Sequence, residues 1–148
     1  MRCSAFINTS RFSALALAVV LSSACAAENA VQQSLRIGPH AFQVEVAATP
    51  QQRERGLMGR ARLPKNGGML FVFDYAGRHC FWMRNTPLPL SIAFIDATGR
   101  IANLADMQPH TDTLHCPVAA IRYALEVPQG GFQQRGIRPG AQVDGLPQ

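Results

Sequence analysis

The hydrophobic positions of this chain fall into short runs that predict strands. Over residues 42–47, bulky apolar residues alternate with smaller or polar ones, which is typical of a strand with one buried face. Residues 69–73 are apolar on both faces and lie between two glycines and an aspartate, which favours a buried strand over a helix. The same reasoning predicts strands over residues 80–83, 90–95, 100–105, 123–127 and 141–144.

Two short helices are predicted between these strands. Thr49, Pro50 and Gln52 have the spacing of a capping box with a proline in the first turn, so a helix is expected to begin there. Two glycines follow closely, and the helix must therefore be short. A single helical turn is predicted over residues 130–135, ended by Gly136.

The order of these elements predicts the fold class. The strands are joined by short turns, and the helical pieces are too short to connect parallel strands in a doubly wound sheet. We expect a mainly β (α+β) fold, a small antiparallel barrel-like sheet with one or two short helices, because closure removes exposed edges. A mixed sheet with two small helices is the alternative. Residues 107–120 contain two prolines and little periodicity, and are predicted to form a loop.

The first 26 residues predict export. Arg2 and Arg11 supply basic charge, an apolar core runs from Phe12 to Leu21, and Ala24-Cys25-Ala26 (residues 24–26) fits a cleavage site, so residues 1–26 are interpreted as a signal peptide. In the competing interpretation, Cys25 is the lipidated first residue of an outer-membrane lipoprotein. Either interpretation places the protein in the periplasm or outside the cell.

The rest of the chain is predicted to hold one domain. Residues 27–40 are interpreted as a linker and a first strand, and residues 41–148 as a single β-rich domain. Hydrophobic residues make up 47% of the 148 residues, and Gly 12 and Pro 10 indicate many turns, which argues against a helical bundle. No apolar run is long enough to predict a transmembrane segment.

The charge pattern does not predict a nucleic-acid partner. The formal net charge is +5, and several of the basic residues gather between residues 53 and 65. No aromatic residues are interleaved with them, so the pattern that binds single strands is missing. A solvated basic face is the favoured interpretation of this cluster.

The cysteines are interpreted in the light of export. Cys80 and Cys116 are the two cysteines after the predicted signal peptide, and an oxidising compartment favours a disulfide between them. Two buried free thiols, or a metal or redox pair, are the alternatives. The spacing is not that of a thioredoxin-type motif.

Six segments together resemble a known family. They are RGLMGRARLP (55–64), GGMLFVF (67–73), CFWMRNTPLPLSIAFID (80–96), ADMQP (105–109), RYALEV (122–127) and RGIRPGAQV (135–143). Their order and spacing are similar to those of domain of unknown function family 192, an uncharacterised group of small, often exported prokaryotic proteins. The resemblance implies a compact β-rich domain and supports the cysteine pairing, but it implies no catalytic residues. Phe132 stands where a tryptophan is frequent in the family.

A candidate binding pocket follows from the cysteine pairing. A bond between Cys80 and Cys116 would draw the loop over the strand that carries Trp82 and bring His79 close to His115. The predicted ligand-binding residues lie on these segments, and Arg84 could alternatively form a salt bridge with Glu126 or Asp96. The candidate residues are Trp82, Arg84, Asn85, Asp106 and His110.

These residues support three functional hypotheses. The leading one is a small ligand-binding or accessory module of the cell envelope that needs no cofactor, because motifs for a nucleophile elbow, a phosphate loop and a zinc helix are absent from the sequence. Its partner would be a small molecule or an envelope component. The second is an envelope hydrolase or lyase that uses Asp106 or His110 as general acid or base. The third is a periplasmic copper-handling protein, with His79, His115 and Met107 as weak ligand candidates.

Overall fold

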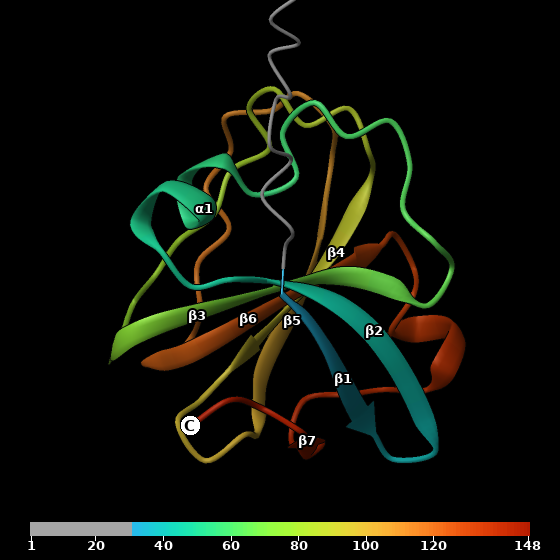
Figure 1. Ribbon diagram of the computed structural model, residues 1–148, viewed down its shortest axis with the longest axis vertical. Coiled ribbons are helices and arrows are strands. Elements are labelled where there is room, and N and C mark those ends of the chain that lie inside the picture. The colour runs from blue at the N-terminus through green and yellow to red at the C-terminus, as the bar shows by residue number, and fades with distance from the viewer. Residues whose placement is uncertain (1–30) are drawn as a thin grey trace, which may run out of the picture.

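The computed structural model describes residues 31–148, which form a single curled sheet with one helix and several loops packed on its outer face (Figure 1). The predicted signal peptide and residues 27–30 lie outside the described residues. Among the described residues, no helix has the length and apolar character needed to cross a membrane.

Within residues 31–148, seven strands join in one sheet, in the order β5-β4-β6-β3-β2-β1-β7. Neighbouring strands are antiparallel except β2 and β3, which run parallel. The mainly β fold is thus confirmed, with a mixed rather than wholly antiparallel sheet. The strands are β1 (Gln32–Ile37), β2 (His40–Ala47), β3 (Gly67–Gly77), β4 (Leu90–Ile95), β5 (Ile101–Met107), β6 (Ile121–Pro128) and β7 (Val143–Asp144).

The two edges of the sheet meet at one end, so the sheet forms a half-barrel. The backbone N–H of Ile101 donates to the carbonyl of Ala141 at 3.0 Å, and the N–H of Val143 donates to the carbonyl of Gly99 at 2.8 Å. These bonds connect the start of β5 with the segment that leads into β7. They satisfy edge groups that would otherwise be open to another strand.

Helix α1 (Pro50–Arg55) lies in the connection between the parallel strands β2 and β3. The Thr49 side chain accepts from the N–H of Gln52, and the Gln52 side chain accepts from the N–H of Thr49, so the predicted capping box is confirmed. The predicted turn before Gly136 is the short 3₁₀ helix η1 (Gln133–Arg135), and Gly136 ends it with a φ of 66°.

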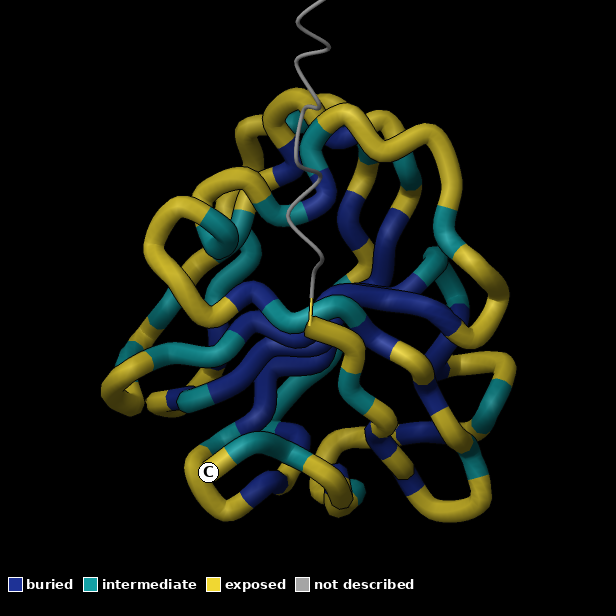
Figure 2. Tube along the Cα trace, in the orientation of Figure 1, coloured by how far each residue is buried: buried dark blue, intermediate teal, exposed yellow. Residues whose placement is uncertain are grey.

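The central strands bury side chains on both faces, as their continuous apolar sequences predict (Figure 2). On β3, Leu70 packs into the cluster inside the curl, together with Phe42 and Phe132. The next residue, Phe71, packs on the opposite face with Met83. The second face is where α1 and the segment after β3 lie (Figure 1).

The run over residues 80–83 is not the strand predicted for it. Only Phe81 forms an isolated bridge, to His115 in the long loop. Its apolar sequence instead packs onto the face of the sheet, because Met83 is buried and Phe81 contacts the rings of Phe71 and Phe94.

Candidate functional site

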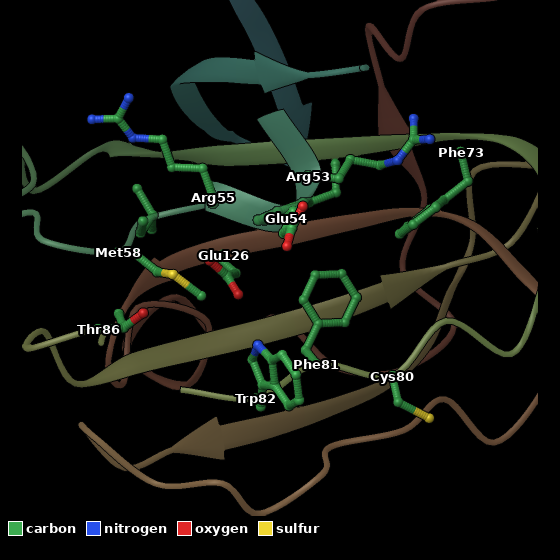
Figure 3. Close-up of a pocket in the computed structure, with 13 residues that line it drawn as sticks. Arg53, Glu54, Arg55, Met58, Phe73, Cys80, Phe81, Trp82, Thr86 and Glu126 are labelled. Atoms are coloured by element: carbon green, nitrogen blue, oxygen red, sulfur yellow. The ribbon is translucent and has the colours of Figure 1, made fainter. Parts of the chain in front are cut away.

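A cavity of about 270 Å³ opens on the second face of the sheet, between α1 and the segment at residues 80–86 (Figure 3). We call it the Glu126 cavity after the carboxyl group at its base. Its lining combines aromatic and aliphatic side chains with a few polar groups. Those drawn and labelled are Arg53, Glu54, Arg55, Met58, Phe73, Cys80, Phe81, Trp82, Thr86 and Glu126.

Glu126 occupies a position where the fold would ordinarily place an apolar side chain. On β6, Leu125 and Val127 point into the core inside the curl, whereas Ala124 and Glu126 share the opposite face. Its cross-strand neighbours are Met69 on β3 and Ile92 on β4. The carboxylic acid is therefore set into a buried, apolar face of the sheet.

The Glu126 side chain is only 4% exposed and receives no hydrogen bond from any other described residue. Loss of hydration disfavours its charged form, and burial raises the pKa of Glu126 to about 8. Buried polar groups are ordinarily paired, so an unpaired carboxyl group beside an open cavity indicates a position for a ligand.

Aromatic rings form the wall opposite α1. The Phe81 ring makes edge contacts with Phe71, at a centroid distance of 4.9 Å, and with Phe73, at 6.2 Å. Trp82 follows Phe81 and is 44% exposed, and Figure 3 shows its indole nitrogen on the side that faces Glu126. The Met58 thioether lies on the other side of the same space (Figure 3).

A disulfide fixes this wall. Cys80 and Cys116 are bonded, with their Cα atoms 4.3 Å apart, which confirms the predicted pair. Phe81 and His115, the adjoining residues, exchange two backbone hydrogen bonds of 2.8 Å. The N–H of Met83 donates to the carbonyl of Thr111 at 3.0 Å. The loop is therefore drawn over the segment that carries Trp82, as expected from the cysteine pairing.

The arginines of α1 do not neutralise Glu126. The Arg53 guanidinium donates to the carbonyl of Ala48, to that of Val72 at 2.8 Å, and to the carboxylate of Asp74 at 3.3 Å. Arg55 extends away from the cavity (Figure 3). Neither of these two arginines is therefore paired with Glu126.

Of the five residues predicted to bind a ligand, Trp82 lines the Glu126 cavity. Arg84 lies beside Trp82, with its guanidinium carbon 4.3 Å from the ring centroid, and pairs with Asp112 at 2.8 Å. This ion pair replaces the alternatives with Glu126 and Asp96. Asn85 adopts a φ of 57°, and its carbonyl accepts from the N–H of Gly59 at 2.9 Å.

Asp106 and His110 lie elsewhere. Asp106 accepts a hydrogen bond from the hydroxyl of Ser91, which in turn accepts from the N–H of Gly130 at 2.9 Å. Ser91 and Asp106 border a separate cavity of about 330 Å³ near η1. The N–H of His110 donates to the carbonyl of Thr86 at 3.1 Å, so the contribution of His110 here is to hold the loop.

The three weak metal-ligand candidates also have different surroundings. The His79 ring stacks on Phe73 with centroids 3.7 Å apart, and Met107 is fully buried in the core. Nε2 of His115 is buried without a hydrogen-bond partner. Within residues 31–148, no group of three or more His, Cys, Asp or Glu side chains is arranged to hold a metal ion.

Sequence reasoning missed Glu126 as a site residue. The signal was present, because the alternation of residues 123–127 places this acid on the same face as Ala124, within a strand whose other face is also apolar. A charged residue on such a face is rare unless it is paired or functional.

The family resemblance agrees with the match to a family model. Residues 31–145 match the model of the DUF192 family, described as "Uncharacterized ACR". No curated protein matches the sequence.

Two solved structures are similar to this one. A protein from Sinorhizobium meliloti 1021, provisionally named a transcription regulator, is 32% identical with a TM-score of 0.76, over 78% of this chain and 95% of that chain. A protein of unknown function from Novosphingobium aromaticivorans DSM 12444 is also 32% identical, with a TM-score of 0.72 over 78% of this chain and 84% of that chain.

Proposed function

The chain belongs to the DUF192 family, and we propose that it is a small exported module that binds a small molecule in the Glu126 cavity. The observation that carries this proposal is the buried Glu126 carboxyl group, which faces the cavity without a partner among the described residues. A ligand with a hydrogen-bonding group supplies the missing partner, and an apolar body fits the aromatic wall.

Export is part of the proposal. The predicted signal peptide supports it, and so does the disulfide between Cys80 and Cys116, because such bonds persist in oxidising compartments. In this setting the ligand is a solute or a component of the cell envelope.

A thermal-shift screen of the purified protein with small molecules tests the proposal, because any ligand of the native state raises the melting temperature. Glu126→Gln keeps the shape of the side chain and removes its ionisable carboxyl group, while Asp144→Asn changes an exposed carboxylate on β7 that does not line this cavity. A ligand is expected to stabilise the wild type and Asp144→Asn, and to lose its effect on Glu126→Gln. Equal stabilisation of all three, or no stabilising compound, would contradict the proposal.

A second candidate function is acid–base catalysis in the same cavity. It is favoured by the raised pKa of Glu126, about 8, since a carboxylic acid that keeps its proton near neutral pH can donate it to a substrate. Asp106 and His110, predicted for this role, are not among the residues that line the cavity. Turnover of an envelope-derived substrate that is lost in Glu126→Gln and retained in Asp106→Asn would favour this candidate.

Our proposal does not assign to this chain the role of transcription regulator that the name of the Sinorhizobium protein suggests. Two members of the basic cluster are already paired, Arg53 with Asp74 and Arg60 with Glu45. An exported protein is also separated by the membrane from chromosomal DNA. Retention of the purified protein on duplex DNA at physiological salt would contradict this view.

A further inference from the structure

Resting on the proposed function, we propose that the ligand of the Glu126 cavity carries an ammonium group on a small apolar body. The juxtaposition that points to this class is an unpartnered carboxyl group set among aromatic rings. The carboxyl group belongs to Glu126, and the rings of Phe81 and Trp82 are among those that line the same cavity (Figure 3).

The carboxyl group favours a cation over a neutral donor. A neutral hydroxyl or amide can form a hydrogen bond with the protonated acid, but it leaves the ionised form of Glu126 uncompensated in an apolar setting. An ammonium group offers both the donor and the opposite charge, and charge-assisted hydrogen bonds are about twice as strong as neutral ones.

The aromatic wall favours the same choice. The face of an aromatic ring attracts cations, and tryptophan does so most strongly. Two rings of this wall already do this within the protein: the Arg84 guanidinium lies 4.3 Å from the Trp82 centroid, and that of Arg53 lies 5.4 Å from the Phe73 centroid. A ligand cation inside the cavity would extend this arrangement.

The other charged groups at the cavity do not compete for Glu126. On α1, Arg53 is held by two carbonyls and Asp74, Arg55 points away, and Glu54 is exposed and adds negative charge. The cross-strand neighbours from β3 and β4, Met69 and Ile92, are uncharged. From the segment opposite, Thr86 offers a hydroxyl that already donates to the carbonyl of Arg84 at 3.4 Å.

The size of the cavity limits the ligand. A volume of about 270 Å³ is just below the range of about 300–1,000 Å³ typical of sites for drug-sized molecules. One aromatic ring or a short alkyl chain with an ammonium group fits this space. Benzylammonium is a suitable probe, and benzyl alcohol and benzoate are neutral and anionic counterparts with the same ring.

Binding of a cation predicts a distinctive pH dependence. The ammonium group binds the ionised carboxylate, so Glu126 must lose its proton as the ligand enters. With the pKa of Glu126 at about 8, the affinity is expected to increase about tenfold per pH unit from pH 6 towards pH 8, and to level off above it. A ligand that accepts a hydrogen bond from the protonated acid would show the opposite trend, with an affinity that falls as the pH rises.

Calorimetric titration of the full protein at pH 6 and pH 8 with these three probes tests the inference. Benzylammonium is expected to bind the wild type and Asp144→Asn, a change at an exposed carboxylate on β7 that does not line the cavity, at least tenfold more tightly at pH 8 than at pH 6, and to lose this binding in Glu126→Gln. Benzyl alcohol and benzoate are expected to bind at least tenfold more weakly than benzylammonium at pH 8.

Two outcomes separate this inference from the function on which it rests. If benzyl alcohol or benzoate binds as tightly as benzylammonium, or if the affinity for benzylammonium is independent of pH in the wild type, the cation inference is overturned while a ligand site remains. If a compound from the thermal-shift screen binds at Glu126 and benzylammonium does not bind at all, the cation inference is again overturned. Failure of every compound contradicts the proposed function itself.

Discussion

Gly68 on β3 lies directly against the backbone carbonyl of Glu126 on β6, so closely that a Cβ atom on Gly68 would come within 2.2 Å of that oxygen. The absence of a side chain at this position lets the two strands pair beside the cavity. A glycine on the neighbouring strand, 58 positions earlier in the chain, therefore allows the close approach of the backbone that carries the unpaired carboxyl group.

Gly68→Ala is expected to destabilise the fold by more than about 3 kcal/mol, because the obstructing atom belongs to the backbone and a strand must shift. Gly38→Ala is the matched control: no atom lies within 4 Å of the Cβ it would add, and its φ of 55° costs only about 1–2 kcal/mol. Denaturant unfolding of both variants measures the difference. Equal losses would contradict the close approach described here.

Glu126 is expected to make the protein less stable as the pH rises. Its pKa is about 8 in the folded protein and 4.5 as the reference value for the unfolded chain, so the folded state holds the extra proton between these values. The contribution of this group is fully present below pH 4.5 and is lost as the pH rises through about 8, at roughly 1 kcal/mol per pH unit.

Denaturant unfolding at pH 5 and pH 8 measures this effect. In Glu126→Gln the part of the pH dependence that comes from this group disappears, and the variant is expected to be more stable than the wild type at pH 8. Glu54→Gln, at an exposed carboxylate, is the control and keeps the wild-type dependence. A Glu126→Gln profile that parallels the wild type between pH 5 and pH 8 would argue against a raised pKa.

Removal of the disulfide is expected to lower the free energy of unfolding by about 4 kcal/mol, because the bond closes a loop between residues separated by 36 positions. The double variant Cys80→Ser, Cys116→Ser is compared with the oxidised wild type by denaturant unfolding. The same change frees the segment with Trp82, so the fluorescence of this sole tryptophan is expected to shift towards that of an exposed indole. An unchanged midpoint would show that the bond does not stabilise the fold.

Arg84→Ala is expected to cost less than about 1 kcal/mol, despite the ion pair with Asp112 and the contact with Trp82. Both side chains of the pair are at least half exposed, and such pairs contribute little in water. A double-mutant cycle with Asp112→Ala isolates the coupling between the two. A coupling energy above about 2 kcal/mol would mean that the pair is protected from solvent.

Ser91→Ala is expected to destabilise the protein by about 1–3 kcal/mol. Its buried hydroxyl donates to Asp106 and accepts from the N–H of Gly130, so the substitution leaves two polar groups without this partner. Ser91→Thr, which keeps the hydroxyl, is the comparison in thermal unfolding. A loss as large in Ser91→Thr as in Ser91→Ala would assign the effect to packing instead.

The strands were predictable from sequence because their side-chain pattern reflects burial directly. The continuous apolar runs of β3 and β4 have two covered faces, and the capping box of α1 is a local signal that needs no tertiary context. The run over residues 80–83 is equally apolar, but it is buried by packing side chains onto the sheet rather than by pairing its backbone. Composition alone does not separate these two modes of burial.

The site was predictable only in part. The predicted pairing of Cys80 with Cys116 led to the loop over Trp82. Asp106 and His110 instead bind Ser91 and Thr86, and the sequence does not reveal these partners. Glu126 was overlooked as a site residue because the sequence suggested only that it could form a salt bridge with Arg84. Its isolation becomes visible only when the neighbours from β3 and β4 are known to be uncharged.

The parallel pairing of β2 and β3 has a consequence for how relatives of this protein diverge. Two parallel neighbours need a long connection, and here that connection contains α1 and one rim of the cavity. Residues 53–58 of this connection line the cavity, and none of them pairs with a strand of the sheet. The strand pairing and the shape of the entrance are thus encoded by different stretches of chain, so the second can change while the first is kept.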